Sequence, residues 1–133
     1  MKTKTVLTAD DAAAITAAGK AEADRNGWKM SVAVVDDGGR LLSVVRLDGA
    51  TYDTSGVALR KAETAAMTGA PSADVERMET DRLTMLTLGD RLPLQGGWPA
   101  IKDGQCVGAV GSSGGLSTQD EQVAKAGLAA IGL

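Results

Sequence analysis

The N-terminal part of the chain has the pattern of a helix. Thr8, followed three residues later by Asp11, forms a capping-box pair at the start of an alanine-rich run. Alanine is the strongest helix former, and the pair Asn26-Gly27 supplies a left-handed stop. These features predict a first helix that begins near Thr8 and ends before Gly27.

Two extended segments follow this helix. Residues 30–36 read MSVAVVD and residues 40–47 read RLLSVVRL, and both are dense in β-branched and aliphatic side chains. The sequence DDGG at 36–39 is a strong turn signal between them. Neither segment alternates cleanly between apolar and polar residues. We therefore expect a hairpin with both faces covered, either by helices or by a partner subunit.

The rest of the chain predicts further helices and a second hairpin. The expected elements are a helix at 53–68 ended by Gly69, a helix at 72–79 capped by Ser72, a helix at 81–88, a loop at 89–97, strands at 98–102 and 105–110, a loop at 111–115, and a helix reaching 131 that is capped by Ser117 with Asp120. The order is α-β-β-α-α-α-β-β-α. Two separate hairpins favour an antiparallel sheet covered by helices, an α/β (α+β) fold in one domain spanning residues 1–133.

Composition narrows the classes of function. The chain has 133 residues, of which 44% are apolar, and it has no histidine, the commonest metal ligand and the usual general base. The single cysteine, Cys106, is interpreted as a buried structural thiol, and we expect no metal site. A net charge of −3 argues against nucleic acid, and no apolar stretch is long enough to cross a membrane. Lys2 and Lys4 are not followed by the apolar core of a signal peptide, so we expect a cytoplasmic protein.

Lys61 is the most informative single position. On a helical wheel it falls inside the apolar arc of the helix predicted at 53–68, between Val57 and Ala65, whereas Thr64 lies off that arc. A cation on the buried side needs an anionic ligand, a carboxylate partner or a subunit contact. The alternative is that the stem packs on the core while the ammonium reaches solvent.

Arg46 and Asp48 close the first hairpin, and Tyr52 follows just before the next helix. An arginine at the end of a strand, beside a turn, can grip a carboxylate through two parallel hydrogen bonds. Equally, Arg46 and Asp48 can pair with each other at the surface, where an ion pair contributes little. Both interpretations stay open.

Two glycine-rich segments have the outline of an anion cradle. The sequence GSSGG at 111–115, with Ser112 and Gly114, precedes the last predicted helix, and Gln95 adjoins the pair Gly96-Gly97. Backbone amides at the start of a helix favour negative charge, although the segment lacks the lysine of a P-loop. The alternative is that these glycines let the chain pass close to a neighbouring segment.

Three segments together resemble the GlcG/HbpS family, which includes the C-terminal domain of PduO-type proteins. They are SVAVVDDGGRLLSVVRLDGA at 31–50, ALRKAETAAMTG at 58–69 and LPLQGGWPAIKDGQCVGAVGSSGGLSTQDEQVAKAGLAAI at 92–131. The resemblance covers nearly the whole chain. It implies a profilin-like antiparallel sheet flanked by helices, assembled into homo-oligomers. Some members bind haem, thought to be held by histidine ligands, and others lie beside catabolic genes. The positions that match the family's pattern are Arg46, Asp48, Lys61, Gly96 and Gly97.

Three functions follow as hypotheses. The first is an oligomeric binding protein that holds a small anionic metabolite near the second helix and the Gly-Gly loop, and that is linked to catabolism. Its expected binding residues are Arg46, Lys61, Tyr52, Gln95, Gly96, Gly97, Ser112 and Gly114. The second is a metal-free isomerase, lyase or hydrolase of small acids or carbonyl compounds, with Lys61 and Asp48 as catalytic residues. The third is haem or tetrapyrrole binding without histidine. We expect no cofactor, because a histidine ligand is excluded by composition.

Overall fold

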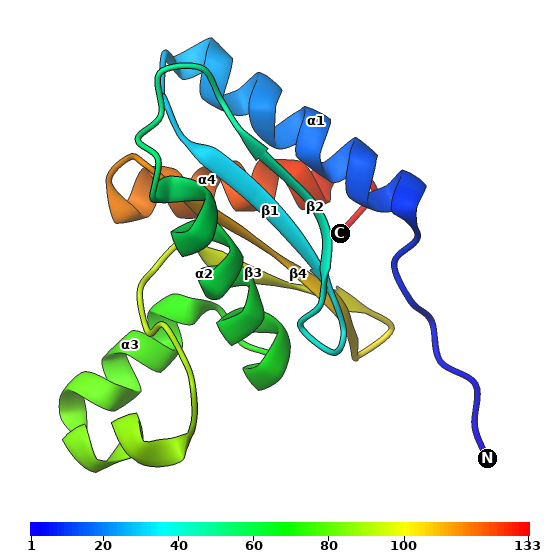
Figure 1. The fold of residues 1–133 in the computed structure, drawn as a ribbon. Helices are drawn as coiled ribbons and strands as arrows, with labels where there is room; N and C mark the ends of the chain where they lie inside the picture. Colours follow the sequence, from blue (N-terminus) through cyan, green and yellow to red (C-terminus); the bar gives the residue numbers. More distant parts are fainter.

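The computed structural model describes all residues, 1–133 (Figure 1). Its elements are α1 (Ala9–Asn26), β1 (Ser31–Asp36), β2 (Leu41–Arg46), α2 (Thr54–Thr68), α3 (Ser72–Asp81), the 3-10 helix η1 (Leu83–Leu88), β3 (Gly97–Lys102), β4 (Gln105–Ser113) and α4 (Ser117–Ala129). The expected order of elements is confirmed, with a 3-10 helix in place of the third of the consecutive helices. No helix has the length and apolar character needed to cross a membrane.

The four strands form one antiparallel sheet in the order β2-β1-β4-β3. The two hairpins therefore meet along β1 and β4, where Ser31 pairs with Ser113 and Asp36 with Gly108. This confirms the antiparallel sheet predicted from two separate hairpins. It also places the C-terminal end of β2, the start of β1 and the end of β4 at the same end of the sheet, because Ser31 lies opposite both Arg46 and Ser113.

Helices cover both faces of the sheet. α1 and α4 pack against each other on one face, and α2 crosses the other face (Figure 1). Every residue of β1 except its last is buried, and this strand is central to the sheet. The expectation that both faces of the first hairpin are covered is confirmed for β1, whereas the helices of the same chain cover β2 incompletely, and its coverage by a partner subunit stays a prediction. That strand lies at the edge of the sheet, and its residues are exposed or only partly buried.

Small residues let α2 approach the sheet closely. Its buried face carries alanines that pack on Val35 and Ala109. A Cβ atom placed on Gly111 would lie 2.0 Å from the carbonyl oxygen of Ala58, and one on Gly97 would lie 2.2 Å from that of Lys61. Real Cβ atoms do not approach oxygen this closely, so both positions require glycine. The backbone of α2 thus rests directly on the backbone of the sheet.

The predicted ends of the first two helices are confirmed. Thr8 and Asp11 form a reciprocal capping box at the start of α1, with the Thr8 amide donating to the Asp11 carboxylate over 2.8 Å. Gly27 and Gly69 end α1 and α2 in the left-handed conformation. In both cases the glycine has the positive φ that L side chains avoid.

Several predictions for the second half of the chain are wrong in detail. Residues 111–113 belong to β4, because β1 provides partners for them as far as Ser31. Ser72 does not cap α3. Its hydroxyl donates to the carbonyl of Leu94 over 2.6 Å and accepts the amide of Gly97. Residues 83–88 form a 3-10 helix with no buried residue. Cys106 is only half-buried.

Candidate functional site

The Lys61 side chain is buried inside the protein between α2, β4 and α4. Its ammonium donates to the Asp120 carboxylate over 2.9 Å and to the carbonyl oxygen of Ser112 over 3.1 Å. Both side chains of the pair are about 95% buried, with exposed fractions of 5% and 4%. The carboxylate partner is therefore the explanation that the structure supports for a lysine on the buried side of its helix. The alternative in which the ammonium reaches solvent is wrong.

Glycine makes room for this ion pair. A Cβ atom on Gly96 would lie 2.9 Å from both the Lys61 Nζ and the Asp120 Cβ. Gly96 has a φ of 130°, and its carbonyl accepts the amide of Ser112 over 3.0 Å. The Gly-Gly loop thus covers the ion pair with bare backbone, as expected for glycines that permit close approach.

The Asp120 carboxylate accepts hydrogen bonds from two donors. One oxygen accepts from Lys61, and the other accepts the backbone amide of Gly115 over 3.0 Å. Burial raises the pKa of Asp120 above its ordinary value, while the Lys61 ammonium and the Gly115 amide oppose that shift. Asp120 therefore does not cap α4 with Ser117 as predicted. The amide of Leu116 is instead satisfied by the Gln119 side chain.

The other predicted residues of this region also make internal contacts. The Ser112 hydroxyl lies 3.1 Å from the sulfur of Met30. The Gln95 amide group donates to Glu121 over 3.2 Å. A Cβ atom on Gly114 would lie 2.6 Å from the carbonyl oxygen of Lys29. Lys61, Gly96, Gly97 and Ser112 are brought together, but as a closed structural cluster.

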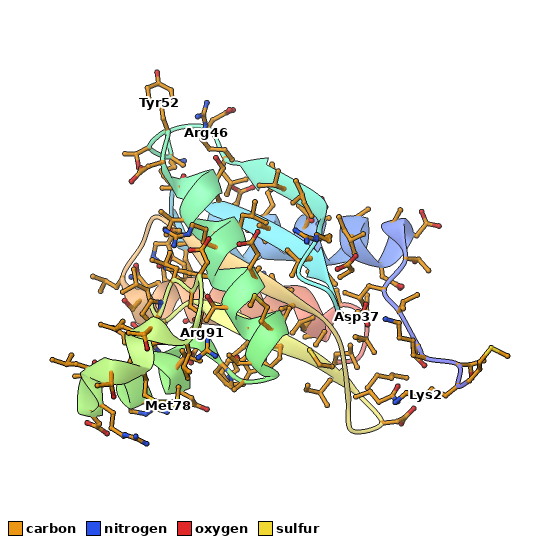
Figure 2. The ribbon with its side chains drawn as sticks, turned by 60° about the horizontal axis from the view of Figure 1, so that its bottom comes forward. Lys2, Asp37, Arg46, Tyr52, Met78 and Arg91 are labelled. Carbon is orange, nitrogen blue, oxygen red and sulfur yellow. The ribbon has the colours of Figure 1, made fainter.

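Arg46, Asp48 and Tyr52 form a separate group on the surface. The Arg46 guanidinium lies over the Tyr52 ring at 4.8 Å from its centroid, and Figure 2 shows the two side chains next to each other at one end of the molecule. With Leu47, Gly49 and Ala50, these three residues line a crevice of about 310 Å³. Tyr52 is 86% exposed, so its ring is accessible to a ligand.

The Arg46 guanidinium has no carboxylate partner. None of the ion pairs in the structure involves Arg46 or Asp48. The alternative in which these two residues pair with each other is therefore wrong for this structure. A second hollow of about 260 Å³ adjoins the same guanidinium and is lined by Lys20, Asp24 and Lys29 among others. Arg46 and Asp48 border both hollows, whereas Lys61 borders neither.

Asp120 and Thr64 are among the buried polar residues that the sequence analysis does not predict. Asp120 is the partner of Lys61, 59 positions away in the chain, and no local pattern connects them. Thr64 was placed outside the apolar arc of its helix, yet it is 1% exposed. Its hydroxyl accepts the amide of Leu92 over 3.0 Å and lies 2.9 Å from the carbonyl oxygen of Arg60. The wheel ranks side chains by apolarity, so it cannot detect a hydroxyl that is buried with partners.

Comparison with known proteins gives consistent matches. The family model described as "Haem degrading protein HbpS-like" matches residues 7–129. Protein GlcG of Escherichia coli strain K12 is 42% identical over 114 residues, which is 85% of either chain. A 15.0 kDa protein of Citrobacter freundii, encoded in the dhaT-dhaS intergenic region, is 34% identical and aligns with 71% of this chain and 70% of its own length.

Solved structures agree with these matches. The crystal structure of a double mutant of HbpS from Streptomyces reticuli superposes with a TM-score of 0.93 at 34% identity, covering 100% of this chain and 92% of that one. The crystal structure of a complex of PduOC with haem superposes with a TM-score of 0.87 at 26% identity, covering 96% of each chain. The fold, the sequence identity and the extent of the matches agree, and the chain belongs to the GlcG/HbpS family.

Proposed function

We propose that this protein binds a small anionic organic metabolite in the crevice formed by Arg46, Asp48 and Tyr52. The observation that carries the proposal is an arginine without a carboxylate partner, packed over an exposed aromatic ring in the wall of that crevice. A guanidinium offers parallel N–H donors that match the geometry of a carboxylate. The contact with Tyr52 restricts the guanidinium, so less side-chain freedom is lost on binding.

The crevice also favours a particular class of acid. Asp48 supplies a carboxylate close to Arg46 in the chain, and a carboxylate accepts hydrogen bonds but donates none. A ligand with a hydroxyl group beside its own carboxylate would satisfy both residues at once. The hydroxy acids are therefore the first candidates, and a simple alcohol lacks the group that Arg46 would bind. The link to catabolism stays a prediction.

Isothermal titration of the purified protein with lactate and malate, and with 2-propanol as the neutral control, tests the proposal. We expect saturable binding of an acid and none of the alcohol. Arg46→Gln should weaken binding at least tenfold, since a charge-assisted pair contributes about 1.5–3 kcal/mol. Arg40→Gln is the matched control, because Arg40 is exposed and lies at the turn of the first hairpin, at the opposite end of β2 from Arg46. Equal binding by both variants would place any ligand elsewhere.

The ring and the hydroxyl of Tyr52 are separable in the same assay. Tyr52→Phe keeps the surface on which Arg46 rests, and Tyr52→Leu removes it. We expect the phenylalanine variant to bind within twofold of the original protein and the leucine variant to bind several-fold more weakly. The reverse order would mean that the hydroxyl contacts the ligand and that the ring does not orient the guanidinium.

The residues present do not fit a haem whose iron is held by the protein. The chain has no histidine. The largest hollow, about 440 Å³, is mainly apolar but has no methionine, cysteine or tyrosine in its lining. Tyr52 lies in a polar crevice on the surface, and Cys106 adjoins Lys2 and Lys4. A haemin titration should give no saturable Soret shift at stoichiometric haemin. A sharp shift that Cys106→Ser or Tyr52→Phe abolishes would overturn this part of the proposal.

We also propose that the protein forms homo-oligomers through η1. This helix exposes Leu83, Leu86 and Leu88, with exposed fractions of 70%, 53% and 55%. Leucine side chains on one short segment lose contact with water when a second copy covers them. Light scattering coupled to size-exclusion chromatography should give a mass above 13.5 kDa for the original protein and a lower mass for Leu83→Lys/Leu86→Lys. An unchanged mass for the variant would exclude this surface.

A further inference from the structure

The 440 Å³ hollow differs in chemistry from the polar crevice beside Arg46. It is the groove that follows β3, the strand at the opposite edge of the sheet from β2, and we call it the β3 groove. Its lining residues are Gly69, Pro71, Trp98, Pro99, Ile101, Lys125, Leu128 and Leu133. They come from the α2–α3 connection, from β3, from α4 and from Leu133 beyond it, so the groove is assembled by segments that are distant in the chain.

One cation lies in this apolar lining. The Lys125 Nζ is 4.5 Å from the centroid of the Trp98 ring, and Lys125 takes part in none of the ion pairs in the structure. No acidic side chain lines the groove. An ammonium held against an aromatic face keeps donors free on its outer side. The groove is therefore complementary to a molecule with an apolar body and one negative group.

The free edge of β3 is a candidate for pairing with an added peptide strand, but Pro99 argues against this. Proline has no amide hydrogen, and Pro99 lies near the middle of β3. An added strand would lose a main-chain hydrogen bond there. The partly exposed rings of Trp98 and Pro71 instead offer rigid apolar surfaces. A volume of about 440 Å³ lies in the usual range for small-molecule sites.

We propose that the β3 groove is a second binding site, independent of the Arg46 crevice, for a planar apolar carboxylate. The aromatic body of the ligand packs against Trp98 and Pro71. Its carboxylate accepts hydrogen bonds from the Lys125 ammonium. The two sites thus select organic anions of different polarity. Arg46 lies in a polar crevice that suits a polar acid, and Lys125 lies in an apolar groove that suits an apolar acid.

The probe for this site is 2-naphthoate, with 2-naphthamide as its uncharged analogue. Trp28 is the only other tryptophan, so a Trp28→Phe background reports binding through the fluorescence of Trp98 alone. We expect saturable quenching by naphthoate and at least fivefold weaker binding of the amide. Lys125→Gln should weaken naphthoate binding about tenfold and leave the amide unchanged. Lys2→Gln, an exposed lysine at the N-terminus, is the control for loss of one positive charge.

A second variant tests the position of the ligand. Ile101 is 42% exposed in the groove, so Ile101→Glu should fold and should repel naphthoate. Arg46→Gln should have no effect on this probe, which separates the β3 groove from the proposed function. The proposal fails if naphthoate does not saturate, if Lys125→Gln binds it normally, or if the amide binds equally well. It also fails if acrylamide cannot quench Trp98 because a second copy covers the groove.

Discussion

Breaking the buried ion pair should destabilise the protein strongly. Lys61→Met retains the length and apolar stem of lysine but removes the ammonium. Asp120 is then left about 95% buried with the Gly115 amide as its only remaining donor. Removing one partner of a buried pair typically costs about 3–5 kcal/mol. For a protein whose unfolding free energy is on the order of 10 kcal/mol, this is a third or more of the total.

Urea unfolding followed by circular dichroism at 222 nm measures this cost. The matched control is Lys20→Met, because Lys20 pairs with Asp24 on the surface of α1 and both side chains are about half exposed. That variant should lose less than about 1 kcal/mol. The double variant Lys61→Met/Asp120→Leu should recover most of the loss, since no charge is then left buried without a partner.

The reasoning would be refuted by either of two results. A loss below about 1 kcal/mol for Lys61→Met would mean that water reaches Asp120 in spite of its burial. A double variant as unstable as the sum of the two single variants would mean that the side chains act independently. The loss in Lys61→Met should also shrink at acid pH, where Asp120 becomes neutral and no longer needs a cation.

Three further predictions concern buried residues of β4, α2 and α4. Gly111→Ala should cost at least about 1–3 kcal/mol in urea unfolding, because its Cβ would meet the carbonyl oxygen of Ala58 at 2.0 Å; a neutral effect would mean that α2 can move away from the sheet. Thr64→Val should cost about 1–3 kcal/mol in the same assay, because the buried hydroxyl bonded to Leu92 is lost, and a stabilised variant would contradict this. Burial raises the pKa of Asp120, so its folded form holds the proton more tightly. The unfolding free energy of the original protein relative to Asp120→Asn should be greatest below pH 3.8 and should fall as the pH rises; a difference that grows with pH would contradict the shift.

The local features of the fold were predictable from the sequence because they depend on neighbouring residues. The capping box of Thr8 and Asp11 closes within one helical turn, and Gly27 and Gly69 end their helices through their own backbone conformation. The two hairpins follow from short turns between apolar runs. The resemblance carried by the longer segments identified the family, which the comparisons confirm.

Features that depend on distant residues were not predictable in this way. Lys61 was recognised as unusual, but its partner Asp120 had a satisfactory local interpretation as a helix cap. The strand β4 continues through Ser113 because β1 offers hydrogen-bond partners there, and no local signal records the length of a neighbouring strand. The sequence analysis assigns Arg46 and Tyr52 to one site, and their contact agrees with this assignment. It also assigns Lys61 to that site, whereas Lys61 lies in the separate buried ion pair.

The contact between the backbones of α2 and the sheet restricts where this fold can vary. A helix that rests on large side chains can tilt or slide as those side chains change, whereas α2 meets Gly97 and Gly111 with no intervening atoms to adjust. These contacts fix the helix at Ala58 and Lys61, one turn after the end of segment 47–53. A change in the length or composition of that segment would therefore reshape the crevice that it lines, while the helix keeps its orientation.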